Sequence, residues 1–288
     1  MIEHQVFKHY LPASMTAGNS ETRVLLIGAG GNGCPMVFGL ARMNYALRAL
    51  GHSGLDITVM DPDTVDSGNV GRQLYSDADL GRNKAVVAVS RANLFFGMNW
   101  TALPMAFEKD HVSQLRDSEF SLVITAVDTV PARRLVQKAV SGKAIYFLDM
   151  GNGKRIGQCV LGTGTYMKQP AKMGSCIGHL PTVFDLYPKL EEDEKKEYQG
   201  PACGTIGDAL EKQDLFINTA VTTFALQLLW EGFRTGTLTT HGVYVNLESK
   251  RTMPLAINPE VWRSMGWNPV VSLKRPGRTA KKPASKAA

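Results

Sequence analysis

The sequence predicts the α/β class, with a doubly wound, mainly parallel sheet that antiparallel strands extend toward the C-terminal end. Three observations predict this class. Short apolar runs alternate with segments of helical spacing up to about residue 150, as in chains that form parallel sheets. A glycine-rich turn, GAGGNG, joins the first apolar run to the first helical segment. Two short runs at 242–249 and 251–257 are typical of a closing antiparallel pair.

The first unit covers residues 23–61. An apolar run at 24–27, the glycine turn and spaced apolar residues from 36 to 50 predict a strand, a tight loop and a helix. After the break GHSG, the run LDITVMD predicts a second strand that ends at Asp61. Such a βαβ unit is right-handed, and open sheets bind ligands beyond the carboxyl ends of their strands. A Rossmann-like sheet is therefore expected.

Further elements follow in the same alternation. Helical spacing occurs within 81–97 and within 131–142, with Pro131 in the first turn of the second segment. Four further strands are expected, at 101–107, 121–127, 144–150 and 155–162. Residues 162–205 show no sustained period and predict a long crossover-type segment, within which the charged run 189–198 is expected to form an exposed helical turn. Residues 213–233 predict a strongly apolar helix packed against the sheet.

Composition and charge bound the domain organisation. The chain is 44% hydrophobic and 20% charged, and we expect one domain over residues 1–270. Residues 271–288 predict a disordered tail whose six basic residues account for the net charge of +6. The neutral remainder argues against a nucleic-acid-binding fold, although the tail leaves weak contact with nucleic acid or an acidic partner open. Neither a signal peptide nor a membrane-spanning run is visible, so a soluble, cytoplasmic protein is expected.

The cysteines and histidines predict little metal chemistry. No CxxC pair occurs among Cys34, Cys159, Cys176 and Cys203, so we expect neither zinc nor disulfides. Cys34 is expected to pack at the start of the first helix, and Cys159 within the sheet. Three histidines in unrelated contexts are expected to be structural or surface groups: His111, His179 and His241.

The glycine loop is the first candidate site. Gly28, Gly30 and Gly33 have GxGxxG spacing, and Gly31 is an additional glycine. Glycine permits a tight turn and close approach to phosphate, and the next helix presents free N–H groups. Such a loop fits NAD, FAD, an S-adenosyl group or ATP, and it can also be a simple strand-to-helix turn. Asp61 can accept hydrogen bonds from the ribose in any of these ligands.

Polar residues after the second strand favour ATP. Asn69, Arg72 and Gln73 follow Asp61, and Lys84 follows in LGRNKA. An arginine fork, a lysine point charge and a neutral amide are together suited to a triphosphate, whereas a nicotinamide cofactor would not need them all. Asp128, just beyond the strand at 121–127, can hold Mg²⁺ against phosphates.

These motifs, in this order, resemble the adenylation domain shared by ThiF, MoeB and the ubiquitin-activating (E1) enzymes, most closely over residues 20–160. The matching residues are Gly28, Gly30, Gly31, Gly33, Asp61, Asp63, Val65, Asn69, Arg72, Gln73, Lys84 and Asp128. The resemblance implies ATP and Mg²⁺. It also implies attack by the C-terminal glycine carboxylate of a small ubiquitin-like protein on the α-phosphate, which gives an acyl-adenylate and pyrophosphate.

The resemblance implies roles for these residues and a homodimer. Asp61 would hold the ribose, Arg72 and Lys84 the phosphates, Asn69 the reacting region and Asp128 the metal. Asp63 and Gln73 join the nucleotide-binding set. Arg72, Lys84 and Asp128 would accelerate the reaction by positioning and by fixed charge.

The chain also departs from the family pattern. Many relatives place an arginine near the N-terminus that reaches the partner subunit's ATP, but here Lys8 stands there and no arginine precedes Arg23. The two-CxxC zinc site of MoeB-like members is absent. Some members pass the acyl group to a cysteine in the crossover loop. Cys203 occupies a comparable place and Cys176 is the second choice, since a thiol near a helix N-terminus can be activated, although an inert loop thiol is the alternative.

A narrower resemblance and two rival functions complete the interpretation. Residues 203–218 and 241–249 resemble ThiF-like proteins of bacterial plasmid-associated gene clusters such as the PRTRC system, which include a small ubiquitin-like protein. An NAD(P)-binding oxidoreductase and a non-catalytic, partner-binding E1-like scaffold are the alternatives. Small carboxylates or a tRNA base as substrate, and a thioester, thiocarboxylate or conjugate as product, remain open.

Overall fold

A computed structural model describes residues 6–170, 175–190, 210 and 213–267. Its main sheet has eight strands: β2 (Thr22–Ile27), β3 (Leu55–Met60), β4 (Thr101–Leu103), β5 (Leu122–Thr125), β6 (Tyr146–Asn152), β7 (Ile156–Thr163), β9 (Thr240–Asn246) and β10 (Arg251–Ala256). Their order is β10-β9-β7-β6-β5-β2-β3-β4. The pairs from β6 to β4 are parallel, and β7, β9 and β10 continue the sheet in antiparallel pairs. The predicted fold class is confirmed.

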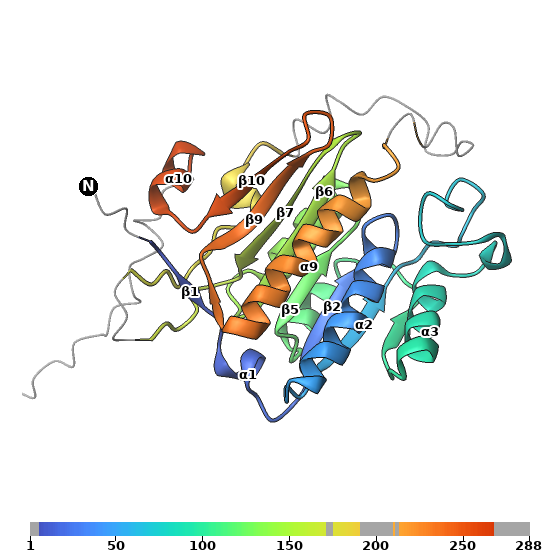
Figure 1. Cartoon of the computed structure of the whole chain (residues 1–288), viewed down its shortest axis with the longest axis horizontal. Helices are drawn as coiled ribbons and strands as arrows, with labels where there is room; N and C mark the ends of the chain where they lie inside the picture. The colour runs from blue at the N-terminus through green and yellow to red at the C-terminus, as the bar shows by residue number, and fades with distance from the viewer. Residues whose placement is uncertain (1–5, 171–174, 191–209, 211–212, 268–288) are drawn as a thin grey trace, which may run out of the picture.

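Helices cover the sheet. Figure 1 shows α9 (Ile217–Thr235), α2 (Gly33–Ala49) and α3 (Lys84–Phe96) side by side in front of the strands, and α2 contacts both neighbours. Elsewhere, α5 (Val130–Val140) packs against β5 and β6, and α4 (His111–Arg116) packs against α5. All four residues of β5 are buried, so both faces of the sheet are covered at its centre.

Local signals explain where the helices begin and end. The Asn83 side chain caps α3 by accepting a hydrogen bond from the Val86 N–H, and Gly97 ends the helix at φ 67°. Gly236 ends α9 in the same left-handed conformation, at φ 68°. These positions agree with the helices predicted for 81–97 and 213–233. The strand expected over 101–107 is shorter, because Pro104 has no N–H to continue the pairing with β3.

Several short elements were not predicted. β1 (His9–Tyr10) pairs with β8 (Thr237–Leu238) in a second, two-stranded sheet. The other short elements are α1 (Ala13–Thr16), η1 (Asp77–Asp79), α6 (Val183–Leu186) and α10 (Pro259–Ser264). Most of the charged run 189–198 and the basic tail 271–288 lie outside the described residues. None of the described helices is both long enough and apolar enough to span a membrane.

Each of the two sheets contains a buried histidine, His241 in β9 and His9 in β1. The His241 ring accepts a 2.8 Å hydrogen bond from the Trp262 indole, and its other nitrogen lies 2.9 Å from the Leu161 carbonyl oxygen. His9 lies 2.7 Å from the Tyr146 hydroxyl. Burial lowers the pKa of both histidines from 6.5 to about 4, so both rings are neutral at pH 7. His241 is therefore the structural group that the sequence predicted.

Candidate active site

The glycine loop leaves the carboxyl end of β2, the strand between β3 and β5. Two of its glycines are required by the fold itself. Gly28 has φ +97°, and a Cβ there would lie 2.6 Å from the Ala126 carbonyl oxygen. A Cβ at Gly33 would lie only 1.9 Å from the carbonyl oxygen of Gly28. The close packing of the loop on the start of α2 therefore excludes larger residues at both positions.

The other two glycines differ from each other. A Cβ at Gly31 would lie 2.5 Å from the Asn218 side-chain nitrogen, so α9 fills that space. Beside Gly30 the nearest atom is the Gln73 side-chain nitrogen, 3.9 Å from the Cβ position. Gln73 is buried, and its side-chain oxygen has no hydrogen-bond partner among the described residues. An open glycine beside an unpartnered buried amide is suited to a polar ligand.

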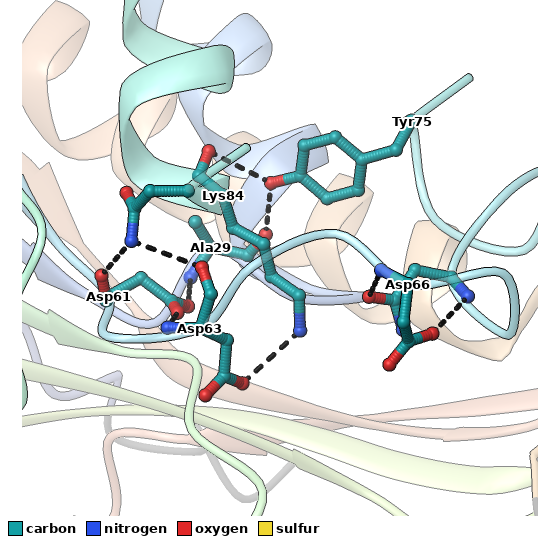
Figure 2. A network of polar contacts seen from close by, with 8 residues as sticks. Ala29, Asp61, Asp63, Asp66, Tyr75 and Lys84 are labelled. Carbon is teal, nitrogen blue, oxygen red and sulfur yellow. Dashed lines mark hydrogen bonds and ion pairs between the residues drawn. The ribbon is translucent and has the colours of Figure 1, made fainter. Parts of the chain in front are cut away.

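Asp61 ties the glycine loop to the loop after β3 (Figure 2). Its carboxylate accepts hydrogen bonds from the backbone N–H groups of Ala29, at 2.5 Å, and Asp63, at 2.8 Å. Burial raises the pKa of Asp61, and these two backbone hydrogen bonds oppose the rise. Because each carboxylate oxygen has a second lone pair, Asp61 can still accept a hydrogen bond from a ribose hydroxyl.

Lys84 begins α3 and is buried. Its ammonium group lies 3.2 Å from the Asp63 carboxylate, whose side chain is 64% exposed. The Tyr75 hydroxyl lies between two backbone carbonyls (Figure 2). It is 2.6 Å from the oxygen of Ala29 in the glycine loop and 3.2 Å from the oxygen of Lys84. Tyr75 thus fixes the backbone of Lys84 against the glycine loop, and the exposed Asp63 carboxylate pairs with the lysine ammonium group.

Asn69 and Arg72 occupy the turn after β3. Asn69 is buried, and its side-chain oxygen accepts a hydrogen bond from the Asp66 N–H at 3.1 Å, while the Asp66 carboxylate accepts one from the Asn69 N–H. Arg72 donates to the Gln213 side-chain oxygen at 3.0 Å and to the Gly68 carbonyl at 3.4 Å. Within the part of the chain that the structure describes, Arg72 forms no ion pair. Among these residues, its guanidinium group is therefore hydrogen-bonded only to uncharged oxygen atoms.

Asp128 lies three residues beyond the end of β5. Solvent reaches the side chain, yet the surrounding protein raises its pKa by desolvation, and the charges of Lys84 and Arg72 oppose this rise. Three of the four predicted catalytic residues are thus close enough for the charges of Lys84 and Arg72 to act on Asp128. No cluster of three metal-ligating side chains occurs among the described residues. Magnesium needs no such cluster, because one carboxylate with phosphate oxygens and water can suffice.

Sequence patterns missed four polar residues around the loop. Tyr75 contacts the loop backbone, and Asn218 in the first turn of α9 fills the space beside Gly31. Gln213, four residues before α9, contacts Arg72 and Asn218. Asn32 donates to the Asn152 side chain at 2.7 Å, and its own side-chain oxygen is buried without a partner among the described residues. Only the position of Asn32 inside the glycine motif was a signal. Tyr75, Gln213 and Asn218 are distant in sequence from the glycine loop, so only the folded chain brings them near it.

The structure leaves the nucleophile prediction untested, because Cys203 lies outside the described residues. Cys176 is partly buried, and its backbone pairs with Lys8 beside β1. Cys34 in α2 and Cys159 in β7 are buried, which raises the pKa of each thiol to about 12. Arg23 lies in β2, 3.6 Å from Asp56.

The fold and this polar loop cluster define a Rossmann-like α/β protein with its candidate site where the sheet order reverses. The model of the ThiF family matches residues 14–227, and the chain belongs to this family. The resemblance to the ThiF, MoeB and E1 enzymes is therefore confirmed.

Curated relatives agree with this family, and solved structures share the fold. The NEDD8-activating enzyme E1 catalytic subunit of Caenorhabditis elegans is 33% identical over 136 residues, which are 46% of this chain and 28% of that protein. Its Dictyostelium discoideum counterpart is 32% identical over 43% of this chain and 26% of its own. The matches thus span little more than a quarter of these relatives. Escherichia coli MccB shares the fold with 15% identity and TM-score 0.58, over 86% of this chain and 65% of its own. PaaA has 14% identity and TM-score 0.56, over 82% and 73%.

Proposed function

We propose that this chain is an ATP-dependent adenylating enzyme that activates the C-terminal glycine carboxylate of a small ubiquitin-like protein. One observation carries the proposal: the positive charges of Arg72 and Lys84 both act on Asp128, and Arg72 forms no ion pair among the described residues. Membership of the ThiF family and the likeness to E1 catalytic subunits support the same conclusion.

The proposed reaction needs little from the protein beyond placement and charge. The triphosphate would lie along Gly30 and the N–H groups at the start of α2, with the ribose on Asp61. A substrate carboxylate oxygen attacks the α-phosphorus, the bond from that phosphorus to the bridging oxygen breaks, and pyrophosphate leaves. Arg72 and Lys84 face the negative charge that builds up on the phosphates. Mg²⁺, which Asp128 would hold, supplies further neutralisation of phosphate charge when bound.

A later transfer to Cys203 belongs to the same proposal. The thiolate would attack the acyl carbonyl and AMP would leave, giving a thioester. The homodimer, and a partner encoded in a PRTRC-type gene cluster, are parts of the proposal that rest on the resemblance alone.

The test is exchange of labelled pyrophosphate into ATP in the presence of candidate ubiquitin-like proteins. Asp128→Asn keeps the size of the side chain but removes its charge, and we expect exchange to fall about 10²-fold or more. Asp117→Asn, at the exposed end of α4, is the matched control and should exchange normally. Absence of exchange with every partner, or normal exchange by Asp128→Asn, would contradict the proposal. Tight binding of NAD without ATP would point to an oxidoreductase instead.

A further inference from the structure

We propose that Gln213 is a positioning residue that holds the Arg72 guanidinium beside the glycine loop, where it meets the phosphates of ATP. Two donors converge on the Gln213 side-chain oxygen: the Arg72 guanidinium at 3.0 Å and the Asn218 amide at 3.4 Å. Gln213 is 141 residues from Arg72 in the chain, so the contact exists only in the folded protein. The inference rests on the proposed function, because it assigns a role within the same site.

The turn that carries Gln213 is itself held in place. The next residue, Asp214, donates its backbone N–H to the Lys154 carbonyl at 2.9 Å, and its carboxylate lies 3.1 Å from the Arg155 guanidinium. Both partners lie in the connection between β6 and β7. The Gln213 backbone is therefore anchored to the sheet and does not depend on Arg72 for its position.

The start of α9 is also fixed against the glycine loop. Asn218 is buried, and its amide occupies the space that a side chain at Gly31 would need. One turn later, the Thr222 hydroxyl donates to the Asn32 carbonyl oxygen at 3.1 Å. Gln213 is thus connected to the glycine loop through Asn218. Its hydrogen bond to Arg72 therefore fixes the position of the guanidinium relative to the loop backbone.

The side-chain chemistry of Gln213 is suited to positioning Arg72. Arginine loses considerable rotamer entropy when it is fixed, so a preformed contact lowers the cost of presenting it to a ligand. A glutamine oxygen accepts a hydrogen bond but carries no charge, so Arg72 is oriented while its positive charge stays available. Lys84 differs, because the Asp63 carboxylate already shares its charge.

Calorimetric titration of the full-length chain with ATP and Mg²⁺ tests this role. Gln213→Met keeps the length of the side chain but removes the acceptor, and we expect the Kd for ATP to rise about tenfold, as for loss of a hydrogen bond to a charged group. Gln114→Met, on an exposed face of α4, is the matched control and should leave Kd unchanged.

A double-variant cycle separates positioning from general disruption. Arg72→Lys keeps the charge but loses the planar fork, so adding Gln213→Met to it should change Kd less than twofold. A tenfold further loss in that background would show a role independent of Arg72 and overturn the inference, as would unchanged ATP binding by Gln213→Met alone. If the unmodified chain did not bind ATP, the proposed function itself would fail.

Discussion

Alanine substitutions at two glycines of one loop should separate folding from ligand binding. A methyl group at Gly33 would lie 1.9 Å from a backbone oxygen, so the loop or α2 must shift. We expect Gly33→Ala to cost roughly 1–3 kcal/mol or more. At Gly30 the nearest atom is 3.9 Å away, which is ordinary contact, and φ is not positive. Gly30→Ala should therefore preserve stability or raise it by about 0.4–1 kcal/mol through the unfolded chain.

In contrast to its small effect on stability, Gly30→Ala should strongly weaken the binding of ATP. Its methyl group would occupy the space through which a phosphate approaches the loop, so affinity for ATP should fall at least tenfold while folding is intact. Thermal unfolding and calorimetric titration of both variants measure the two effects, with about 2–4 °C expected per kcal/mol. A melting temperature for Gly30→Ala as low as that of Gly33→Ala would refute the steric reasoning. Normal ATP affinity would show that the phosphates lie elsewhere.

Two further predictions concern stability. The buried Arg133 and Asp149 form an ion pair, so Arg133→Met should destabilise the fold by about 3–5 kcal/mol in urea unfolding, and adding Asp149→Leu should restore most of the loss. His9 and His241 have folded-state pKa values near 4, below 6.5, so the unfolded chain binds more protons between these values. Stability should therefore decrease as pH falls from 6.5 to 4, by roughly 2 kcal/mol per histidine at pH 5, and His241→Gln should flatten this slope. A slope unchanged in that variant would exclude His241 as the source.

Most of the regular structure could be predicted from sequence because its causes are local. The glycine turn, the Asn83 cap and the glycines after α3 and α9 act within a few residues. The two-stranded sheet of β1 and β8 could not be predicted, since it joins segments more than 200 residues apart. The predicted extent of β4 was also wrong, because Pro104 has no N–H to continue the pairing with β3.

Some features of the candidate site could likewise be predicted from sequence, and others could not. Asp61 follows β3 directly and Asp128 lies three residues beyond β5, and the parallel order of these strands puts their carboxyl ends at one edge of the sheet. The roles of these residues stay predictions. The sequence did not reveal that Asp61 bridges two loops or that Asp63 faces Lys84, since these depend on side-chain directions.

The chain's residue pattern was sufficient to determine the α/β class, the glycine loop and the ThiF family, because steric limits and hydrophobic spacing operate along short stretches of chain. Only folding determined that α9 returns to the loop and that Gln213 meets Arg72, 141 residues earlier. Contacts of that kind depend on how whole elements pack. The same packing leaves Gly30 open and fills the space beside Gly31.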